Sequence, residues 1–376
     1  MRVLFAGVPG IGHLFPLVPL ARAVRALGHE VAVASMDGGE PVAAAGLPYL
    51  PLAPGVDWST EVRAAGRTER PDLLRRVVET NAADREAFVP LAAHVNSLVA
   101  DAAVELAARW RPDLVVYDYQ FPVALLAAST LGVPAVQHDL GFVRTPRLRK
   151  LMLDEMAETF ARHGVDPLPE PADTLDIAPP SMAGTERYGR LLRPVAYNGE
   201  GALPEPLAAP ARRPRVAVTL GTVPPRTDGL TRIERVIDAA AGLDADFVLA
   251  TGDLDLATLA ALPDNVHAYG WVPWRALLDT CAAAVHHGGS GTALAALDAG
   301  IPQLALPDGS DRFINADAVR ERGAGLSAGA EEIGPALLER LLTDTAPARA
   351  AREVSAEIAA MPGPDEVAAR LVDLAG

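Results

Sequence analysis

The chain has 376 residues, half of them hydrophobic, and a formal net charge of −15. Its length exceeds the size at which a single hydrophobic core usually keeps growing, so two domains are expected. The acidic balance without a cluster of Lys and Arg excludes a surface that tracks a phosphate backbone, and the single cysteine, Cys281, excludes an internal disulfide or a cysteine-based metal site.

The start of the chain, "MRVLFAGVPGIGHLFPLVPL", is apolar but is interrupted by three prolines and by His13. A signal peptide needs a continuous apolar core, so none is expected here. No run of eighteen apolar residues follows elsewhere. We therefore expect a cytoplasmic protein without a membrane segment.

Short apolar runs alternate with helical patterns in both halves of the chain, which predicts βαβ units with parallel sheets. Strands are expected at 2–8, 30–35, 113–118 and 135–139 in the first half, and at 216–221, 246–252, 266–271, 282–288 and 302–307 in the second. The proline-rich stretch 203–215 between the halves has neither period and is interpreted as a linker. The prediction is an α/β protein of two Rossmann-like, doubly wound domains, 1–205 and 206–355, with a helix in 356–376 that crosses back to the first domain.

Ligands bind beyond the carboxyl ends of parallel strands, and the cleft between two such domains is the expected site. His13 follows a glycine-rich turn after the first strand, and Asp118 ends a later strand. A histidine at such a place can accept a proton near neutral pH, whereas a helix cap for His13 and a loop cap for Asp118 are the structural alternatives. His138 and Asp139 end another strand, where we favour a structural role over a binding role.

The segment 287–292, "HGGSGT", joins a strand to the start of a helix. Free backbone amides and small residues at such a turn form a cradle for an anion, to which His287 and Thr292 add side-chain donors. It matches neither the Walker A pattern nor GxGxxG. On the residues alone this predicts a phosphate or diphosphate site, with a merely tight turn as the alternative.

The wider pattern resembles the nucleotide-sugar signature of GT-B glycosyltransferases of family 1. The matching stretches are "WVPW" (271–274), "HGGSGT" (287–292), "GIP" (300–302) and "PDGSD" (307–311). The spacing from Thr292 to Pro302, Pro307 and Asp311 agrees with the family without a gap. Such a match over forty positions implies the GT-B fold and an activity typical of enzymes that glycosylate natural products.

The resemblance also implies a role for each matching residue. Trp271 would stack on the nucleobase, His287 and Thr292 would hold the diphosphate, Asp311 would bind sugar hydroxyls, and His13, oriented by Asp118, would be the general base. The full set of expected donor-binding residues is Gly221, Thr222, Trp271, Val272, His287, Gly288, Gly289, Ser290, Gly291, Thr292, Asp311 and Arg312.

Three positions depart from the family pattern. Ala295 stands where the family usually has a glutamate that binds the ribose, and alanine cannot accept a hydrogen bond from a 2′-hydroxyl. Arg312 and Trp274 each replace a glutamine, which we interpret as a sugar end unlike a glucose pocket. Together these changes favour a thymidine diphosphate deoxysugar over a uridine donor.

The prediction is an inverting, metal-independent glycosyltransferase that moves a deoxysugar from a dTDP donor to a hydroxyl of a hydrophobic natural product, as in antibiotic biosynthesis. Irregular, apolar sequence at 51–100 and 140–200 is where the acceptor is expected to bind. The acidic pair at 253–255 is interpreted as a helix start, so no metal site is expected. No nucleic acid or membrane partner is expected, and the oligomeric state, a homodimer included, stays open.

Other functions compete with this prediction. A UDP-sugar transferase of the same fold would keep the site but change the donor. A sugar-nucleotide epimerase would need acid and base groups flanking the second sugar carbon, and no such pair is evident. A transferase for lipid-linked acceptors would need a membrane-docking face, which the acidic balance disfavours. A nucleotide-sugar-binding protein that activates a partner transferase would not need His13 and Asp118.

Overall fold

The computed structural model describes residues 1–68, 70–80, 84–184, 188–221, 231–252 and 261–375. The chain forms two compact units. Unit 1 comprises Met1–Ala178, Ala183–Val195 and Met361–Gly376, and unit 2 comprises Pro179–Met182 and Ala196–Ala360. The unit thus changes after Val195, ahead of the linker expected at 203–215. Thr222 and the acidic pair at 253–255 lie outside the described residues.

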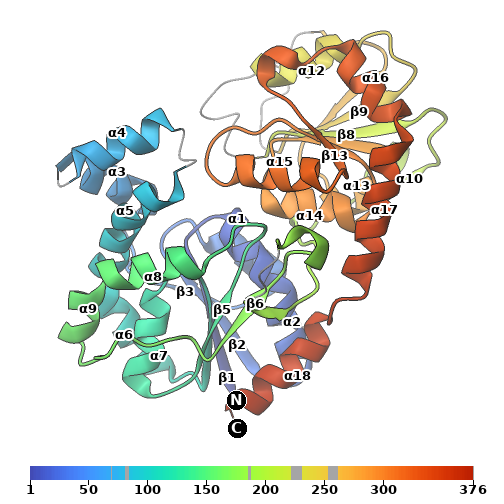
Figure 1. Ribbon diagram of the computed structural model, residues 1–376. Coiled ribbons are helices and arrows are strands. Elements are labelled where there is room, and N and C mark those ends of the chain that lie inside the picture. Colours follow the sequence, from blue (N-terminus) through green and yellow to red (C-terminus); the bar gives the residue numbers. More distant parts are fainter. Residues whose placement is uncertain (69, 81–83, 185–187, 222–230, 253–260, 376) are drawn as a thin grey trace. The chain divides into compact units, whose positions relative to one another are not determined.

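Unit 1 is built on a seven-stranded sheet in the order β3-β2-β1-β4-β5-β6-β7, in which every pairing is parallel (Figure 1). Its strands are β1 (Arg2–Ala6), β2 (Glu30–Ser35), β3 (Tyr49–Pro51), β4 (Leu114–Asp118), β5 (Ala135–His138), β6 (Asp173–Asp176) and β7 (Arg190–Leu191). Its helices are α1 (Ile11–Leu14), α2 (Val18–Ala26), α3 (Trp58–Thr68), α4 (Pro71–Glu79), α5 (Arg85–Leu98), α6 (Ala100–Trp110), α7 (Val123–Leu131), α8 (Pro146–Glu155), α9 (Ala157–Arg162) and α18 (Pro364–Ala375).

The central strands of unit 1 are apolar on both faces because helices cover both sides of a parallel sheet. Val3 and Phe5 of β1 and Val115 and Val116 of β4 are completely buried. The expectation of irregular sequence at 51–100 is wrong, since α3, α4 and α5 occupy most of that range. The last helix, α18, packs against α2 within unit 1.

Unit 2 has a six-stranded parallel sheet in the order β10-β9-β8-β11-β12-β13. Its strands are β8 (Arg215–Thr219), β9 (Asp246–Ala250), β10 (Val266–Tyr269), β11 (Ala283–His286), β12 (Gln303–Ala305) and β13 (Gly325–Ser327). Its helices are α10 (Glu205–Ala208), α12 (Thr231–Ala240), α13 (Trp274–Leu278), α14 (Ser290–Asp298), α15 (Arg312–Glu321), α16 (Pro335–Thr343) and α17 (Thr345–Ala359). The expected linker contains α10, whose Leu207 is buried among apolar residues of this unit.

The parallel pairing brings the carboxyl ends of neighbouring strands together at one edge of each sheet. In unit 1, β1 and β4 are adjacent, so the turn after Ala6 lies beside Tyr117 and Asp118. In unit 2, β8 and β11 are adjacent, with Thr219 opposite His286. The described site residues that follow these four strands are therefore neighbours within each unit.

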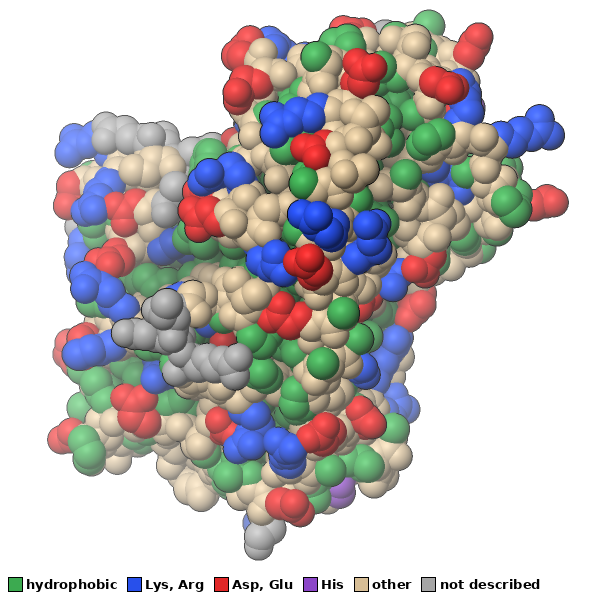
Figure 2. Space-filling model, turned by 45° about the vertical axis from the view of Figure 1, so that its right-hand side comes forward, with side chains coloured by type: hydrophobic (Ala, Val, Ile, Leu, Met, Phe, Trp, Pro, Cys, Tyr) green, Lys and Arg blue, Asp and Glu red, His purple; other side chains and the backbone are tan. Residues whose placement is uncertain are grey.

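The surface carries charges of both signs. On the face shown in Figure 2, Lys and Arg side chains are interspersed with Asp and Glu side chains. Among the described residues no single helix is long and apolar enough to cross a membrane, and the pair α5 and α6, which together would suffice, is bent by 53°.

Candidate active site

His13 and Asp118 are in direct contact in unit 1. Nδ1 of His13, in the short helix α1, lies 2.5 Å from Oδ2 of Asp118 at the end of β4. The carboxylate is completely buried, and its other oxygen accepts a hydrogen bond of 2.9 Å from the backbone amide of Gln120. The His13 side chain is 27% exposed, so a ring held from behind by a buried carboxylate reaches solvent. This arrangement leaves Nε2 to take a proton from a bound hydroxyl.

His138 and Asp139 lie in the interior, at the end of the neighbouring strand β5. Both side chains are completely buried. Asp139 accepts hydrogen bonds from Gln137 at 2.8 Å and from Thr145 at 2.9 Å, and the Tyr188 hydroxyl also donates to it. Burial raises the pKa of Asp139 to about 6. These contacts agree with the structural role favoured for the pair.

The segment 287–292, called the glycine turn from here on, follows β11 in unit 2 and leads into α14. Gly289 is the N-cap of α14 and provides no side-chain cap, so the first amides of the helix have no capping side chain. Gly291 is exposed and Thr292 is half-buried. A helix start of this kind binds anions through its amides and its dipole.

The ring of His287 is enclosed by two glycines. A Cβ atom at Gly221 would lie 2.6 Å from Cε1 of His287, and one at Gly289 would lie 2.5 Å from its Nε2. Gly221 also has a φ of +70°, which favours glycine. Burial, aided by the charge of Arg312, lowers the pKa of His287 to about 3. His287 is thus a neutral imidazole that can donate one hydrogen bond to an anion.

Asp311 is tied to the glycine turn by Ser290 and Asn315. Its Oδ2 accepts from the Ser290 hydroxyl at 3.0 Å and from the Asn315 amide at 3.1 Å. The same amide donates to the carbonyl of Gly288 at 2.8 Å. Asn315 is completely buried and was not among the predicted residues. Its position one helical turn after Asp311 on α15 was the signal that could have identified it.

Trp271 follows β10 and is 41% exposed. The backbone of Gly199 covers one part of the indole, since a Cβ there would lie 2.6 Å from Cζ2. A partly exposed aromatic ring at a strand end is suited to stacking on a planar base. Val272, next in the chain, is 5% exposed, so its side chain is not available to a nucleotide.

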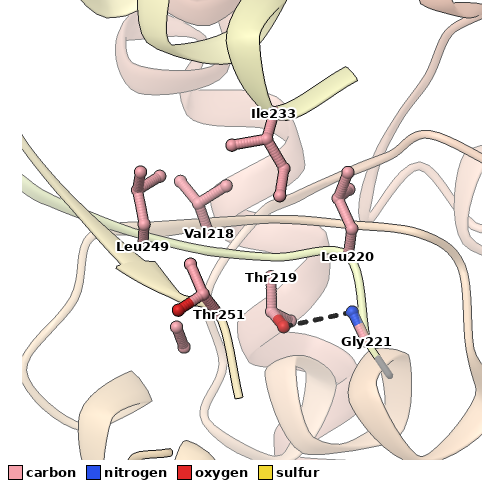
Figure 3. A pocket seen from close by; sticks show the side chains of 8 residues that line it. Val218, Thr219, Leu220, Gly221, Ile233, Leu249 and Thr251 are labelled. Atoms are coloured by element: carbon pink, nitrogen blue, oxygen red, sulfur yellow. Dashed lines mark hydrogen bonds between the residues drawn. The ribbon is translucent and has the colours of Figure 1, made fainter. Parts of the chain in front are cut away.

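The carboxyl ends of β8 and β9 border a small pocket, shown in Figure 3. Val218 and Leu220 point toward Ile233 of α12, whereas Thr219 points away and accepts a hydrogen bond of 3.2 Å from the amide of Gly221. Thr251 also lines the pocket, and its hydroxyl donates to the carbonyl of Tyr269 at 2.8 Å. The first of these bonds holds the end of β8, where Gly221 packs against the ring of His287.

Comparison with known proteins identifies the family. Residues 22–221 and 234–374 match the models of the N-terminal and C-terminal domains of the erythromycin biosynthesis protein CIII-like family. The chain is also 41% identical to the elloramycin glycosyltransferase ElmGT of Streptomyces olivaceus, over 99% of this chain and 97% of that protein. The chain belongs to the EryCIII-like glycosyltransferases.

Solved structures confirm the expected GT-B fold of this EryCIII-like glycosyltransferase. The crystal structure of the glycosyltransferase SnogD from Streptomyces nogalater matches with a TM-score of 0.87 and 38% identity, over 100% of this chain and 99% of that one. The spinosyn rhamnosyltransferase SpnG complexed with thymidine diphosphate matches with a TM-score of 0.85 and 30% identity, over 99% and 100% of the two chains. SpnG has also been solved with spinosyn aglycone.

The position of Trp274 in this EryCIII-like glycosyltransferase differs from the prediction. Trp274 is 5% exposed and belongs, with Val272 and the completely buried Ala295, to one apolar cluster. Its side chain therefore lies in the protein interior and does not form a sugar pocket. Arg312 begins α15, and its guanidinium donates to the carbonyl of Asp308.

Substituting Gly221 tests whether the position of His287 matters to the EryCIII-like glycosyltransferase. In Gly221→Ala the new methyl group would displace the imidazole, so we expect the affinity for dTDP to fall about tenfold or more, as for the loss of a hydrogen bond to a charged group. Gly242→Ala is the matched control, because Gly242 has a φ of +80° with no atom within 4 Å of its Cβ position. Calorimetric titration with dTDP compares the two, and equal affinities would contradict the prediction.

The protonation state of His286 can be measured in the EryCIII-like glycosyltransferase. Its Nδ1 accepts from the amide of Gly288 at 3.0 Å and its Nε2 lies 2.6 Å from Oε1 of Gln303, which requires the neutral Nε2–H tautomer. Burial lowers its pKa to about 4. We expect the ¹⁵N chemical shifts of the His286 ring, assigned with His286→Gln, to remain those of a neutral imidazole from about pH 8 to pH 5.5. Because the unfolded pKa is near 6.5, stability should fall as the pH drops from about 6.5 toward 4. A titration midpoint near 6.5 would contradict this.

Proposed function

We propose that this EryCIII-like glycosyltransferase is an inverting enzyme that moves a deoxysugar from a dTDP donor to a hydroxyl of a hydrophobic natural-product aglycone. The observation that carries the proposal is the contact of 2.5 Å between His13 and the buried Asp118. A histidine supported in this way has the arrangement of a general base.

In the proposed reaction Nε2 of His13 takes the proton of the acceptor hydroxyl as its oxygen attacks the anomeric carbon. The bond from that carbon to the diphosphate breaks, and the configuration inverts because the attack is direct. Asp118 holds the ring by Nδ1 and stabilises the imidazolium as it forms. The charge that gathers on the leaving diphosphate is met by the amides of α14 and by His287.

The donor is proposed to be thymidine-linked because of the residues at the expected ribose position. Ala295 and Trp274 belong to the same buried cluster, so neither presents a polar atom in place of the family's glutamate and glutamine. Neither position thus provides an acceptor for a ribose 2′-hydroxyl, so no contact there favours ribose over deoxyribose, which lacks that hydroxyl. The complex of SpnG with thymidine diphosphate supports this choice, and rhamnose, which SpnG transfers according to its name, is a deoxysugar.

No metal is proposed to take part. Among the described residues no three His, Cys, Asp or Glu side chains are grouped so that they could hold a metal ion. The amides at the start of α14 and the neutral His287 can bind the diphosphate instead.

The acceptor class is supported by SpnG, whose structure with spinosyn aglycone is known.

The test is calorimetric titration of the whole protein with dTDP and with UDP, without divalent metal. We expect dTDP to bind more tightly. A preference for UDP would overturn the thymidine assignment while keeping the site, which is the UDP-sugar alternative. Binding of neither nucleotide by folded protein would overturn the proposed donor site.

A further inference from the structure

The segment 197–201, "YNGEG", borders the proposed donor site within unit 2. Gly199 has a φ of +91°, and a Cβ atom there would lie 2.6 Å from Cζ2 and 2.9 Å from Nε1 of Trp271. Gly201 lies near the same ring, with its Cβ position 3.9 Å from Cδ1 of Trp271. The two glycines thus let the backbone of this segment lie directly on the indole proposed to hold the base.

Asn198 extends from this segment to the other end of the proposed donor site. Its Nδ2 atom lies 3.9 Å from the Cβ position of Gly291, in the first turn of α14. Its Oδ1 atom is buried and has no hydrogen-bond partner. A buried amide oxygen without a partner is uncommon in proteins, since the missing bond costs free energy. Asn198 therefore has hydrogen-bonding capacity that the described residues do not use, beside the turn proposed to hold phosphate.

We propose that Asn198 is a donor-binding residue that contacts the nucleoside diphosphate between its base and its second phosphate; this rests on the proposed donor site. Gly199 places Asn198 beside Trp271, which is proposed to stack on the base. Nδ2 of Asn198 lies next to the first turn of α14, which is proposed to bind the diphosphate. The amide group donates hydrogen bonds to the anionic oxygens of the diphosphate, and its oxygen can accept one from the deoxyribose 3′-hydroxyl. Asn198 thereby links recognition of the nucleoside to recognition of the diphosphate.

The test compares Asn198→Ala and Asn198→Asp with the unchanged protein by calorimetric titration with dTDP. Asn198→Ala removes the amide donors and should weaken dTDP binding about tenfold or more, the usual effect of losing a hydrogen bond to a charged group. Asn198→Asp has nearly the same shape but places a carboxylate beside the diphosphate, so its affinity should fall further than that of the alanine variant. A larger loss for aspartate than for alanine is the signature of a phosphate contact. Thermal melting of each variant checks that the fold is kept.

The outcomes separate this inference from the proposed function. If the unchanged protein binds dTDP and both variants bind it equally well, Asn198 is not a donor-binding residue, whereas the proposed donor site stands. If both variants lose affinity to the same extent, the contact with the diphosphate is overturned. If the unchanged protein binds no dTDP, the proposed donor site itself is overturned, and this inference falls with it.

Discussion

In His13→Ala, kcat is expected to fall by about 10² to 10⁴, the usual contribution of a general base. The reason is that His13 is the residue proposed to receive the hydroxyl proton, and Asp118 behind it is completely buried and cannot replace it at the acceptor. The affinity for dTDP should not change, because the proposed donor residues belong to unit 2 and His13 belongs to unit 1. Steady-state turnover with an aglycone and a dTDP sugar, together with calorimetry, measures both quantities.

His163→Ala is the control for this experiment. His163 also lies beside a carboxylate, with Nε2 3.0 Å from Asp101, but that pair is not at the carboxyl end of a strand. Its substitution should leave kcat unchanged. Retention of full turnover by His13→Ala would overturn the mechanism, because catalysis would then not require His13. Turnover by neither the unchanged protein nor His13→Ala, with dTDP binding kept, would favour the view that the protein binds nucleotide sugars to activate a partner.

Ala295→Glu is expected to lower the free energy of unfolding by about 3 kcal/mol or more, because it buries an unpaired carboxylate. Ala295 has no exposed surface and lies in the cluster that contains Trp274. The double variant Ala295→Glu with Trp274→Gln should recover part of this loss, because the smaller, polar glutamine opens the cluster and can bind the glutamate. The double variant should also bind UDP better, relative to dTDP, than the unchanged protein does.

Urea unfolding of the unchanged protein, Ala295→Glu, Trp274→Gln and the double variant measures the coupling between positions 295 and 274. Ala356→Glu is the control for the substitution itself, since Ala356 lies exposed on α17. It should change the free energy of unfolding by no more than about 0.5 kcal/mol. If Ala295→Glu is equally mild, position 295 accommodates a carboxylate and does not lie in a closed apolar cluster.

The sequence predicted the strands that contain apolar runs but missed four short strands with few apolar residues. The strands β1, β2, β4 and β5 each have a run of apolar residues that the pattern detects. The missed strands β3, β6, β7 and β13 have only two to four residues and few apolar ones. Three of them lie at the edges of their sheets, where one side has no partner strand and less burial is needed.

The candidate site likewise contains residues whose places the sequence pattern predicted and residues that it did not. The places of His13, Asp118 and the glycine turn followed from the rule that functional residues lie after parallel strands. Trp274 was misinterpreted because sequence periodicity does not show which side of a five-residue helix is buried. Asn198 was not predicted because the first turn of α14, which its side chain approaches, is distant in the sequence, so their proximity depends on tertiary folding.

The return of the last helix to unit 1 limits how hybrid enzymes can be made from this chain. Residues 361–375 belong to unit 1, and α18 packs on α2. A hybrid that joins unit 1 to the second unit of a relative at Val195 alone would pair α2 with a foreign terminal helix. Both junctions, after Val195 and before Met361, are needed to exchange one unit with its own interior intact.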